Sequence, residues 1–290
     1  MIRLYFSTVL IAAGASAQST LTAQSNTFNS SFTLSNAQIA AADINDTIAN
    51  NVNVAIQFER TNWALGSVHN DSFYSVPSNS STAPAGSLLK LERYTNTSYF
   101  TVPPDVALSR ILFQSETLNG STVPASAFVL WPWMPRKEPR TGRYAVVGWA
   151  HGTSGVYGEC APSHIRNLWY QYSAPFTLAL QGYVVVAPDY AGLGVTEYAN
   201  GTEIRHPYLS NPSHANDMFY SVEAAQAAFP ELSSYFVLMG HSQGGGAAWS
   251  AAQRQAKRAV AGYLGTIAGS PVTNTIDQID FLGGSTGLAL

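Results

Sequence analysis

The pentapeptide Gly240-His241-Ser242-Gln243-Gly244 fits the pattern G-x-S-x-G and separates two different periodicities. Before it stands the apolar run Tyr235-Phe236-Val237-Leu238-Met239, which is typical of a buried strand, and after it a helical pattern extends from 245 to about 258. A strand, a sharp turn and a helix are the surroundings in which this pattern forms a nucleophile elbow. We therefore predict that the turn presents Ser242 as a catalytic nucleophile; the alternative is a purely structural turn.

The residues around the serine suit a sharp turn. The positions two before and two after Ser242 must be small, and both are glycine. Gly245 and Gly246 continue the permissive stretch. The turn would leave the backbone N–H of Gln243 at a helix N-terminus, where negative charge is favoured. Gln243 is therefore the first predicted donor of an oxyanion hole.

Strand-type runs recur on both sides of the elbow. Upstream, the runs at 108–117 and 123–131 flank Asn119-Gly120, a strong hairpin signal. The remaining patterns are strand-type at 144–150, 183–187, 235–239 and 260–268, and helix-type at 165–180 and in a segment with Ser213 as its N-cap. This alternation predicts a mostly parallel sheet with helices on both faces, and together with the nucleophile elbow it indicates an α/β-hydrolase fold. After 260–268 no strand-like run follows, so we expect the fold to be incomplete at the C-terminus.

A second predicted donor lies directly after the strand at 144–150. The loop reads His151-Gly152-Thr153-Ser154-Gly155. In this fold the loop after the third strand supplies the other oxyanion N–H group. Thr153 is the expected donor, and Gly152 lets the backbone approach a substrate; a mere Gly-rich turn is the alternative reading.

The general base that a serine nucleophile needs is not apparent. The triad order in this fold is Ser, then Asp or Glu, then His, yet no histidine follows His241. His241 should point away from the neighbouring hydroxyl, and His151 belongs to the oxyanion loop. The other histidines, which we expect to be structural, at the surface or without supporting context, are His69, His164, His206 and His214.

The carboxylates do not complete a triad either. Asp277 and Asp280 could hold a histidine, and Asp189 is better read as a loop-fixing residue than as a catalytic acid. The simplest expectation is that the sequence stops before the strands that position the Asp and His.

The N-terminus has the features of a secretory signal. Arg3, the apolar stretch 4–13 and Ala15-Ser16-Ala17 predict a signal peptide over 1–17, although an apolar first helix is the alternative. Residues 18–100 should form an N-terminal extension and loops packing on the core, and 101–290 the hydrolase core. Asn-x-Ser/Thr sequons begin at Asn29, Asn45, Asn70, Asn79, Asn96, Asn119 and Asn200. We expect a secreted, extracellular glycoprotein.

Composition narrows the partners. Charged residues are only 11% of the 290, which argues against nucleic acid, whereas the net charge of −3 is uninformative. No later segment is long and apolar enough to span a membrane, so the mature protein should be soluble. The single cysteine, Cys160, is either a free thiol or half of a disulfide whose partner is not in the sequence. The patch Trp131-Pro132-Trp133-Met134 could touch lipid transiently, but a buried aromatic cluster is the favoured reading.

With these motifs the chain resembles the secreted (secretory) lipase family of α/β-hydrolases. The matching pieces are Asp71-Ser72-Phe73-Tyr74 with Pro77, Pro84-Ala85-Gly86-Ser87-Leu88-Leu89, His151-Gly152-Thr153, Asp189-Tyr190-Ala191-Gly192-Leu193-Gly194, His206-Pro207-Tyr208-Leu209 and the elbow. The resemblance implies carboxylic-ester hydrolysis on triacylglycerol-type substrates, with acyl chains under a helical cap that 277–290 would begin. The family's downstream Asp and His have no counterpart here.

The expected function is therefore secreted serine ester hydrolysis through an acyl-enzyme on Ser242. The covalent route needs no metal and no organic cofactor. A serine peptidase of the same fold and a non-catalytic binding protein on a hydrolase scaffold are the alternatives.

Overall fold

The computed structural model describes residues 32–274, so the predicted signal peptide, Asn29, Asp277 and Asp280 lie outside the described residues. The strands are β1 Leu88–Glu92, β2 Val106–Glu116, β3 Thr122–Pro132, β4 Tyr144–Ala150, β5 Val184–Pro188, β6 Leu232–His241 and β7 Tyr263–Gly269. The α-helices are α1 Asn36–Ala41, α2 Asp46–Thr61, α3 Pro175–Leu180, α4 Asn211–Ala228 and α5 Gln243–Lys257. Short 3₁₀ turns lie in the connecting loops.

The strands form one mixed sheet in the order β1-β2-β3-β5-β4-β6-β7. The pairs from β1 through β3 to β5 are antiparallel, and the pairs β5-β4, β4-β6 and β6-β7 are parallel. The hairpin predicted at Asn119-Gly120 joins β2 to β3. The predicted α/β-hydrolase fold is confirmed.

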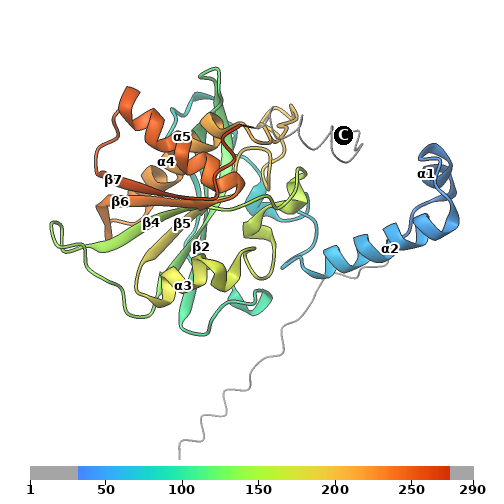
Figure 1. Ribbon diagram of the computed structural model, residues 1–290, viewed down its shortest axis with the longest axis horizontal. Coiled ribbons are helices and arrows are strands. Elements are labelled where there is room, and N and C mark those ends of the chain that lie inside the picture. The colour runs from blue at the N-terminus through green and yellow to red at the C-terminus, as the bar shows by residue number, and fades with distance from the viewer. Residues whose placement is uncertain (1–31, 275–290) are drawn as a thin grey trace, which may run out of the picture.

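Helices cover both faces of the sheet (Figure 1). Side chains alternate along β5, as the strand period requires. Val184 and Val186 pack with α4 and α5, whereas Val185 and Ala187 pack with α3. The layers therefore follow from one continuous apolar run that is buried on both sides.

The helix predicted over 165–180 is mostly absent. Only Pro175–Leu180 is helical, and before it Leu168, Trp169 and Gln171 adopt positive φ angles of 53°, 57° and 46°. Proline suits the first turn of a helix but not its interior, so the helix begins at Pro175.

The N-cap predicted for α4 is also wrong. The helix begins at Asn211 after Ser210, and Ser213 lies buried inside its first turn. Pro212 can occupy that turn without breaking it, so the helix starts before the proline and not after it.

The α1–α2 segment projects away from the sheet (Figure 1), whereas we expected it to pack on the core. Among the residues of α2 only Ala49 is buried, and Val54 and Phe58 are exposed. Beyond the helix, the Ala64 N–H donates to the His164 carbonyl and ties the segment to the body. The proposed domain boundaries stay a prediction.

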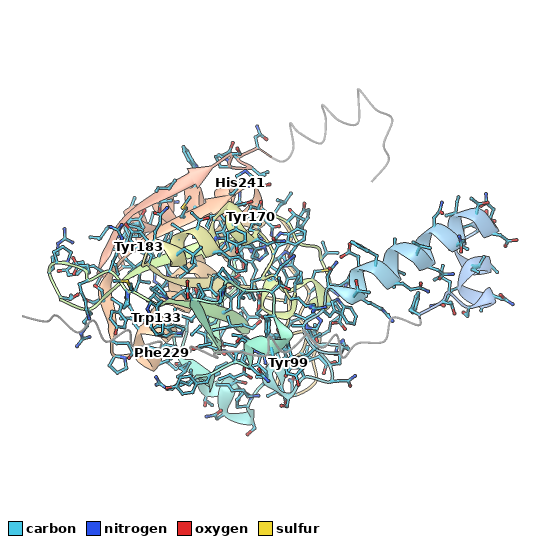
Figure 2. The ribbon with its side chains drawn as sticks, turned by 90° about the horizontal axis from the view of Figure 1, so that it is seen from below. Tyr99, Trp133, Tyr170, Tyr183, Phe229 and His241 are labelled. Carbon is cyan, nitrogen blue, oxygen red and sulfur yellow. The ribbon has the colours of Figure 1, made fainter. Side chains whose placement is uncertain are left out.

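The reading of Trp131–Met134 as a buried aromatic cluster is wrong for two of its residues. Trp131 packs edge-on against Phe229, with ring centroids 4.7 Å apart, but Trp133 and Met134 are 81% and 79% exposed. They follow β3, which runs antiparallel to β5, so they lie at the amino ends of the parallel strands (Figure 2). In residues 32–274 no helix has the length and apolarity needed to cross a membrane.

Candidate active site

Ser242 occupies the bend between β6 and α5. Its φ of 57° and ψ of −119° are sparsely populated for a non-glycine residue, and such conformations concentrate at functional sites. The Ser242 N–H donates to the Gly269 carbonyl over 3.0 Å, which fastens the bend to β7. The residue is partly exposed.

Glycine is required around this bend because backbones meet there. A Cβ on Gly240 would lie 2.1 Å from the Gly244 carbonyl oxygen, and one on Gly244 would lie 2.0 Å from that of Ala150. A Cβ on Gly245 would lie 2.2 Å from the Gly269 carbonyl oxygen. The start of α5 therefore rests directly on the ends of β4 and β7.

The two predicted oxyanion residues come together in the structure. Since β4 and β6 are parallel neighbours, the loop after β4 and the elbow after β6 meet at one edge of the sheet. The Thr153 hydroxyl donates to the Gln243 side-chain carbonyl over 3.0 Å. Thr153 and Gln243 are thus joined beside Ser242, and their backbone N–H groups are the candidate oxyanion donors.

His151 and Gly152 shape the loop that carries Thr153. The buried His151 ring lies 2.7 Å from the Gly152 carbonyl through Nδ1 and 3.2 Å from the Asp189 carbonyl through Nε2. Burial lowers the pKa of His151 to about 4, so the ring is neutral near pH 7. A Cβ on Gly152 would lie 2.0 Å from the Tyr170 hydroxyl, so a larger residue here would displace the Tyr170 side chain.

Two residues at the surface flank this loop. The Tyr170 hydroxyl lies 2.7 Å from Nδ1 of the exposed His241. Figure 2 shows Tyr170 and His241 close together, away from Trp133. His241 is therefore engaged with Tyr170, as its expected orientation away from Ser242 requires.

Sequence reasoning missed the surroundings of the Gln243 side chain. This side chain is 1% exposed, and its amide nitrogen lies 3.2 Å from Nε2 of both His206 and His214. Neither histidine was assigned a role beyond structure or surface. The sequence did carry one signal: Gln243, a polar residue, directly follows the nucleophile. A polar side chain that is buried at this position needs hydrogen-bond partners.

Asp189 fixes loops, in agreement with the sequence interpretation. Its carboxylate accepts hydrogen bonds from the Ser126 hydroxyl and from the hydroxyl and backbone N–H of Ser163. Burial raises the pKa of Asp189 to about 6. His164 pairs with Glu159 at 3.1 Å, away from Ser242.

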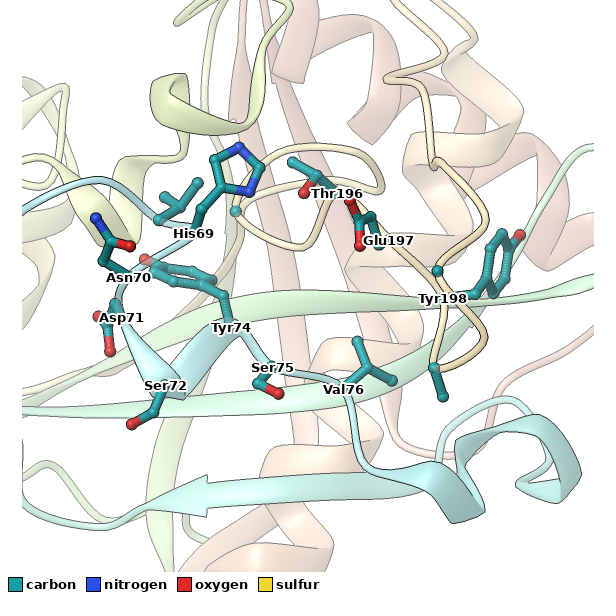
Figure 3. A pocket seen from close by; sticks show the side chains of 14 residues that line it. His69, Asn70, Asp71, Ser72, Tyr74, Ser75, Val76, Thr196, Glu197 and Tyr198 are labelled. Carbon is teal, nitrogen blue, oxygen red and sulfur yellow. The ribbon is translucent and has the colours of Figure 1, made fainter.

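Two hollows differ in their relation to the elbow. The pocket in Figure 3, of about 580 Å³, lies between 68–76 and 194–201, and His69, Asp71 and Glu197 are among its lining residues. None of its lining residues belongs to the elbow or the oxyanion loop. A second hollow of about 540 Å³ includes Thr153 and is otherwise lined by residues 167 and 169–173. The second hollow is the one that adjoins the candidate oxyanion hole.

The general base is not found among residues 32–274. None of the histidines in this range hydrogen-bonds to the Ser242 hydroxyl. The described residues also contain no group of His, Cys, Asp and Glu that could hold a metal ion. Cys160 is partly buried, and burial raises the pKa of its thiol.

Comparison with known proteins agrees with this geometry. Residues 174–281 match the model of the dienelactone hydrolase family, a stretch that contains β5, the elbow and β7. A search of curated proteins finds no match.

Solved structures share the fold. The rice cell wall degrading esterase LipA from Xanthomonas oryzae is 25% identical with a TM-score of 0.50, over 63% of this chain and 50% of that one. Candida antarctica lipase A in its closed state is 20% identical with a TM-score of 0.50, over 70% of this chain and 46% of that one. The chain thus spans about half the length of these structures, and its fold is that of an α/β-hydrolase.

Proposed function

We propose that this protein is a secreted serine carboxylic-ester hydrolase that forms an acyl-enzyme on Ser242. The observation that carries the proposal is the position of Ser242 at a strained bend, beside a Thr153–Gln243 pair whose backbone N–H groups can stabilise negative charge. The ester class is supported by the match to a hydrolase family model and by the likeness to an esterase.

The chemistry would proceed in two steps. The Ser242 Oγ attacks the ester carbonyl carbon, and the N–H groups of Gln243 and Thr153 hold the oxyanion. Collapse of the tetrahedral intermediate expels the alcohol and leaves an acyl-Ser242 ester; water then releases the acid and restores the hydroxyl. Rapid acylation also requires a base to take the Ser242 proton, a role that no histidine of residues 32–274 fills.

A fluorophosphonate probe tests the nucleophile. We expect the folded protein to be labelled at Ser242, slowly because no histidine of residues 32–274 serves as the base, and the Ser242→Ala variant not to be labelled. Ser250→Ala, which removes a buried serine from the same helix, should be labelled like the parent. Absence of label on Ser242 in folded protein would refute the proposal.

The substrate class needs a separate assay. We propose triacylglycerol-type esters, because of the motifs shared with secretory lipases and the hollow beside Thr153. p-Nitrophenyl esters of increasing acyl length should be cleaved in preference to aminoacyl amides. Faster cleavage of the amides would favour a serine peptidase.

One observation favours a second candidate, a binding protein on a hydrolase scaffold. No histidine within residues 32–274 contacts the Ser242 hydroxyl. Such a protein would bind an ester without turnover, and isothermal titration of a slowly hydrolysed ester would detect the complex.

Secretion and glycosylation are part of the proposal. The six sequon asparagines within the described residues are all exposed: Asn45, Asn70, Asn79, Asn96, Asn119 and Asn200. Expression in a eukaryotic secretory host should deliver protein to the medium, and its mass should fall on deglycosylation. Retention in the cells without glycans would contradict this part.

A further inference from the structure

The Gln243 side chain is a buried amide whose hydrogen-bonding groups all have partners. Its oxygen accepts from the Thr153 hydroxyl at 3.0 Å, and its nitrogen lies 3.2 Å from Nε2 of both His206 and His214. We call these four residues the Gln243 clasp. A primary amide has two N–H groups, so each imidazole can accept one of them.

The orientation of the amide follows from the His206 ring. His206 Nδ1 lies 2.9 Å from the Ala191 carbonyl, which can only accept, so Nδ1 carries the proton. In the neutral ring Nε2 is then an acceptor, and it requires an N–H group of Gln243. The Gln243 oxygen must therefore face Thr153.

The second imidazole, that of His214, faces a carboxylate on its other side without hydrogen-bonding to it. His214 Nε2 accepts from Gln243, so its proton lies on Nδ1, which faces Asp217 Oδ2 at 3.8 Å. The same Asp217 oxygen accepts the Ala191 N–H over 3.2 Å. Ala191 is thus held at its N–H by Asp217 and at its carbonyl by His206, which fixes the His206 ring to the loop after β5. His214 Nδ1 itself makes no hydrogen bond.

The clasp reaches the oxyanion loop through Thr153. Because the Thr153 hydroxyl gives its proton to Gln243, the Tyr208 hydroxyl is the donor in the 3.2 Å contact between Tyr208 and Thr153. The two candidate oxyanion residues therefore share a direct side-chain hydrogen bond, although they lie on different loops. Their backbone N–H groups cannot move apart without breaking it.

We propose that the Gln243 side chain is a positioning group that sets the separation of the two oxyanion N–H donors, with His206 and His214 acting as its acceptors and not as catalytic bases. The inference rests on the proposed ester hydrolysis and assigns these residues a part in it. Preorganised donors matter because their geometry must fit the transition state, and losing one costs about 10²–10³ in turnover.

The test compares matched variants of the full chain. Gln243→Met keeps the length of the side chain but removes both hydrogen-bonding groups, and Gln253→Met makes the same change at an exposed position of the same helix. Thr153→Val removes only the hydroxyl, while Thr153→Ser keeps it. The readouts are the rate of Ser242 phosphonylation by a fluorophosphonate, KM and kcat for a p-nitrophenyl ester, and hydrogen–deuterium exchange of residues 151–157.

We expect Gln243→Met and Thr153→Val to slow phosphonylation by roughly tenfold to a hundredfold, less than full removal of a donor. Thr153→Ser should recover most of the loss, and Gln253→Met should match the parent. For the ester, kcat should fall while KM changes little, because ground-state binding does not use the oxyanion hole. Exchange of 151–157 should be faster in Gln243→Met than in Gln253→Met.

Phosphonylation at the parent rate in both Gln243→Met and Thr153→Val would overturn the inference. If Gln243→Met does not fold, the Thr153→Val and Thr153→Ser pair decides alone. If the parent is not phosphonylated at all, the ester-hydrolase proposal fails, and the exchange rates decide on the clasp. Faster exchange in Gln243→Met then supports it, and unchanged exchange overturns it.

Discussion

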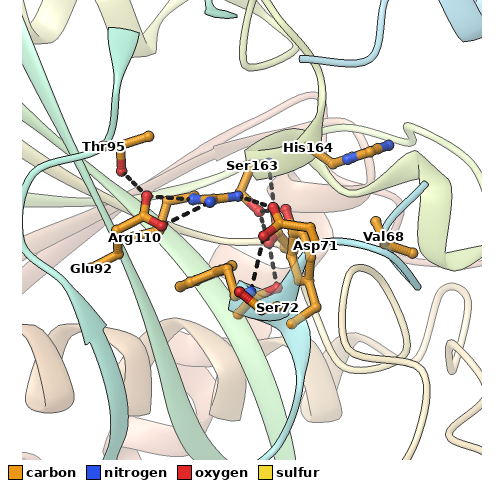
Figure 4. A network of polar contacts seen from close by, with 12 residues as sticks. Val68, Asp71, Ser72, Glu92, Thr95, Arg110, Ser163 and His164 are labelled. Atoms are coloured by element: carbon orange, nitrogen blue, oxygen red, sulfur yellow. Dashed lines mark hydrogen bonds and ion pairs between the residues drawn. The ribbon is translucent and has the colours of Figure 1, made fainter. Parts of the chain in front are cut away.

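Two buried polar clusters hold this molecule together by different means. In the first, the Arg110 cluster, the Arg110 guanidinium bonds to Asp71 at 2.8 Å and to Glu92 at 2.9 Å, and it lies 4.1 Å from the ring centroid of Phe73 (Figure 4). The second is the Gln243 clasp, in which an amide bonds to one hydroxyl and two imidazoles.

The difference lies in what each cluster positions. The Arg110 cluster fastens the segment at Asp71 and strand β1 onto β2, far along the chain from the elbow. The clasp joins loops at the edge of the sheet that carries Ser242. A fixed negative charge there would compete with the oxyanion for the same N–H donors. The comparison teaches that charge secures the fold here, while neutral hydrogen bonds set the geometry of the candidate site.

The largest expected effect is on the stability supplied by the Arg110 cluster. Arg110→Met leaves two carboxylates without their cation, one of them nearly buried, and breaking such a pair costs about 3–5 kcal/mol. Urea unfolding would measure the loss. The control is Arg93→Met, which removes an exposed 3.9 Å pair with Glu231 and a 3.0 Å hydrogen bond to the Ala228 carbonyl and should cost about 1–2 kcal/mol. Equal losses in the two variants would show that burial gives the Arg110 pairs no extra stability.

The clasp should contribute less to stability than to function. Gln243→Met leaves the Thr153 hydroxyl and two imidazole nitrogens without their partner, for which we expect a loss of about 1–3 kcal/mol. Urea unfolding beside Gln253→Met would measure it. A loss larger than that of Arg110→Met would reverse the comparison.

Acid should act on two buried histidines, His206 of the clasp and His151 of the oxyanion loop. Burial lowers the pKa of His206 and of His151 to about 4, below the 6.5 of an unfolded histidine. The unfolded chain therefore binds these protons first, and stability falls as pH drops from about 6.5 toward 4, by at most about 1.4 kcal/mol per pH unit per histidine.

One buried carboxyl opposes this trend. Because the pKa of Asp189 is raised to about 6, its contribution is present at low pH and is lost as pH rises through 6. Urea unfolding between pH 7 and 4.5 should give a flatter acid limb for His206→Gln and a steeper one for Asp189→Asn. If the unfolding free energy of His206→Gln falls with pH as steeply as that of the parent, His206 is not the group whose protonation destabilises the protein.

The smallest effect should come from charge without burial. Arg205 and Glu203 pair at 3.2 Å beside His206, but their side chains are 84% and 66% exposed. Glu203→Gln should change the unfolding free energy by less than about 0.5 kcal/mol and leave Ser242 labelling unaltered. A larger change would show that proximity to the clasp, and not burial, determines how much a charged side chain contributes to the free energy of unfolding.

Local patterns were sufficient to predict most of the sheet and the elbow. The run Tyr144–Ala150 matches β4 residue for residue, because a strand buried on both faces is continuously apolar. The helix over 165–180 was over-predicted because apolar spacing does not reveal the left-handed residues before Pro175.

The clasp could not be predicted from such patterns. Gln243 meets His214 across 29 residues and His206 across 37, and contacts of that range depend on how the loops pack. What the sequence did allow was the prediction of Thr153 and Gln243 as oxyanion donors, because in this fold they come from the loop after the third strand and the residue after the nucleophile.

The exposed Trp133 and Met134 have one consequence for any encounter with lipid. They stand at the amino ends of the parallel strands, and the nucleophile stands at the carboxyl ends. A protein molecule adsorbed on a lipid droplet through these two side chains would have Ser242 on the side that faces bulk water. Adhesion at this end and turnover at the other would then be separate events, and replacing Trp133 would alter the first alone.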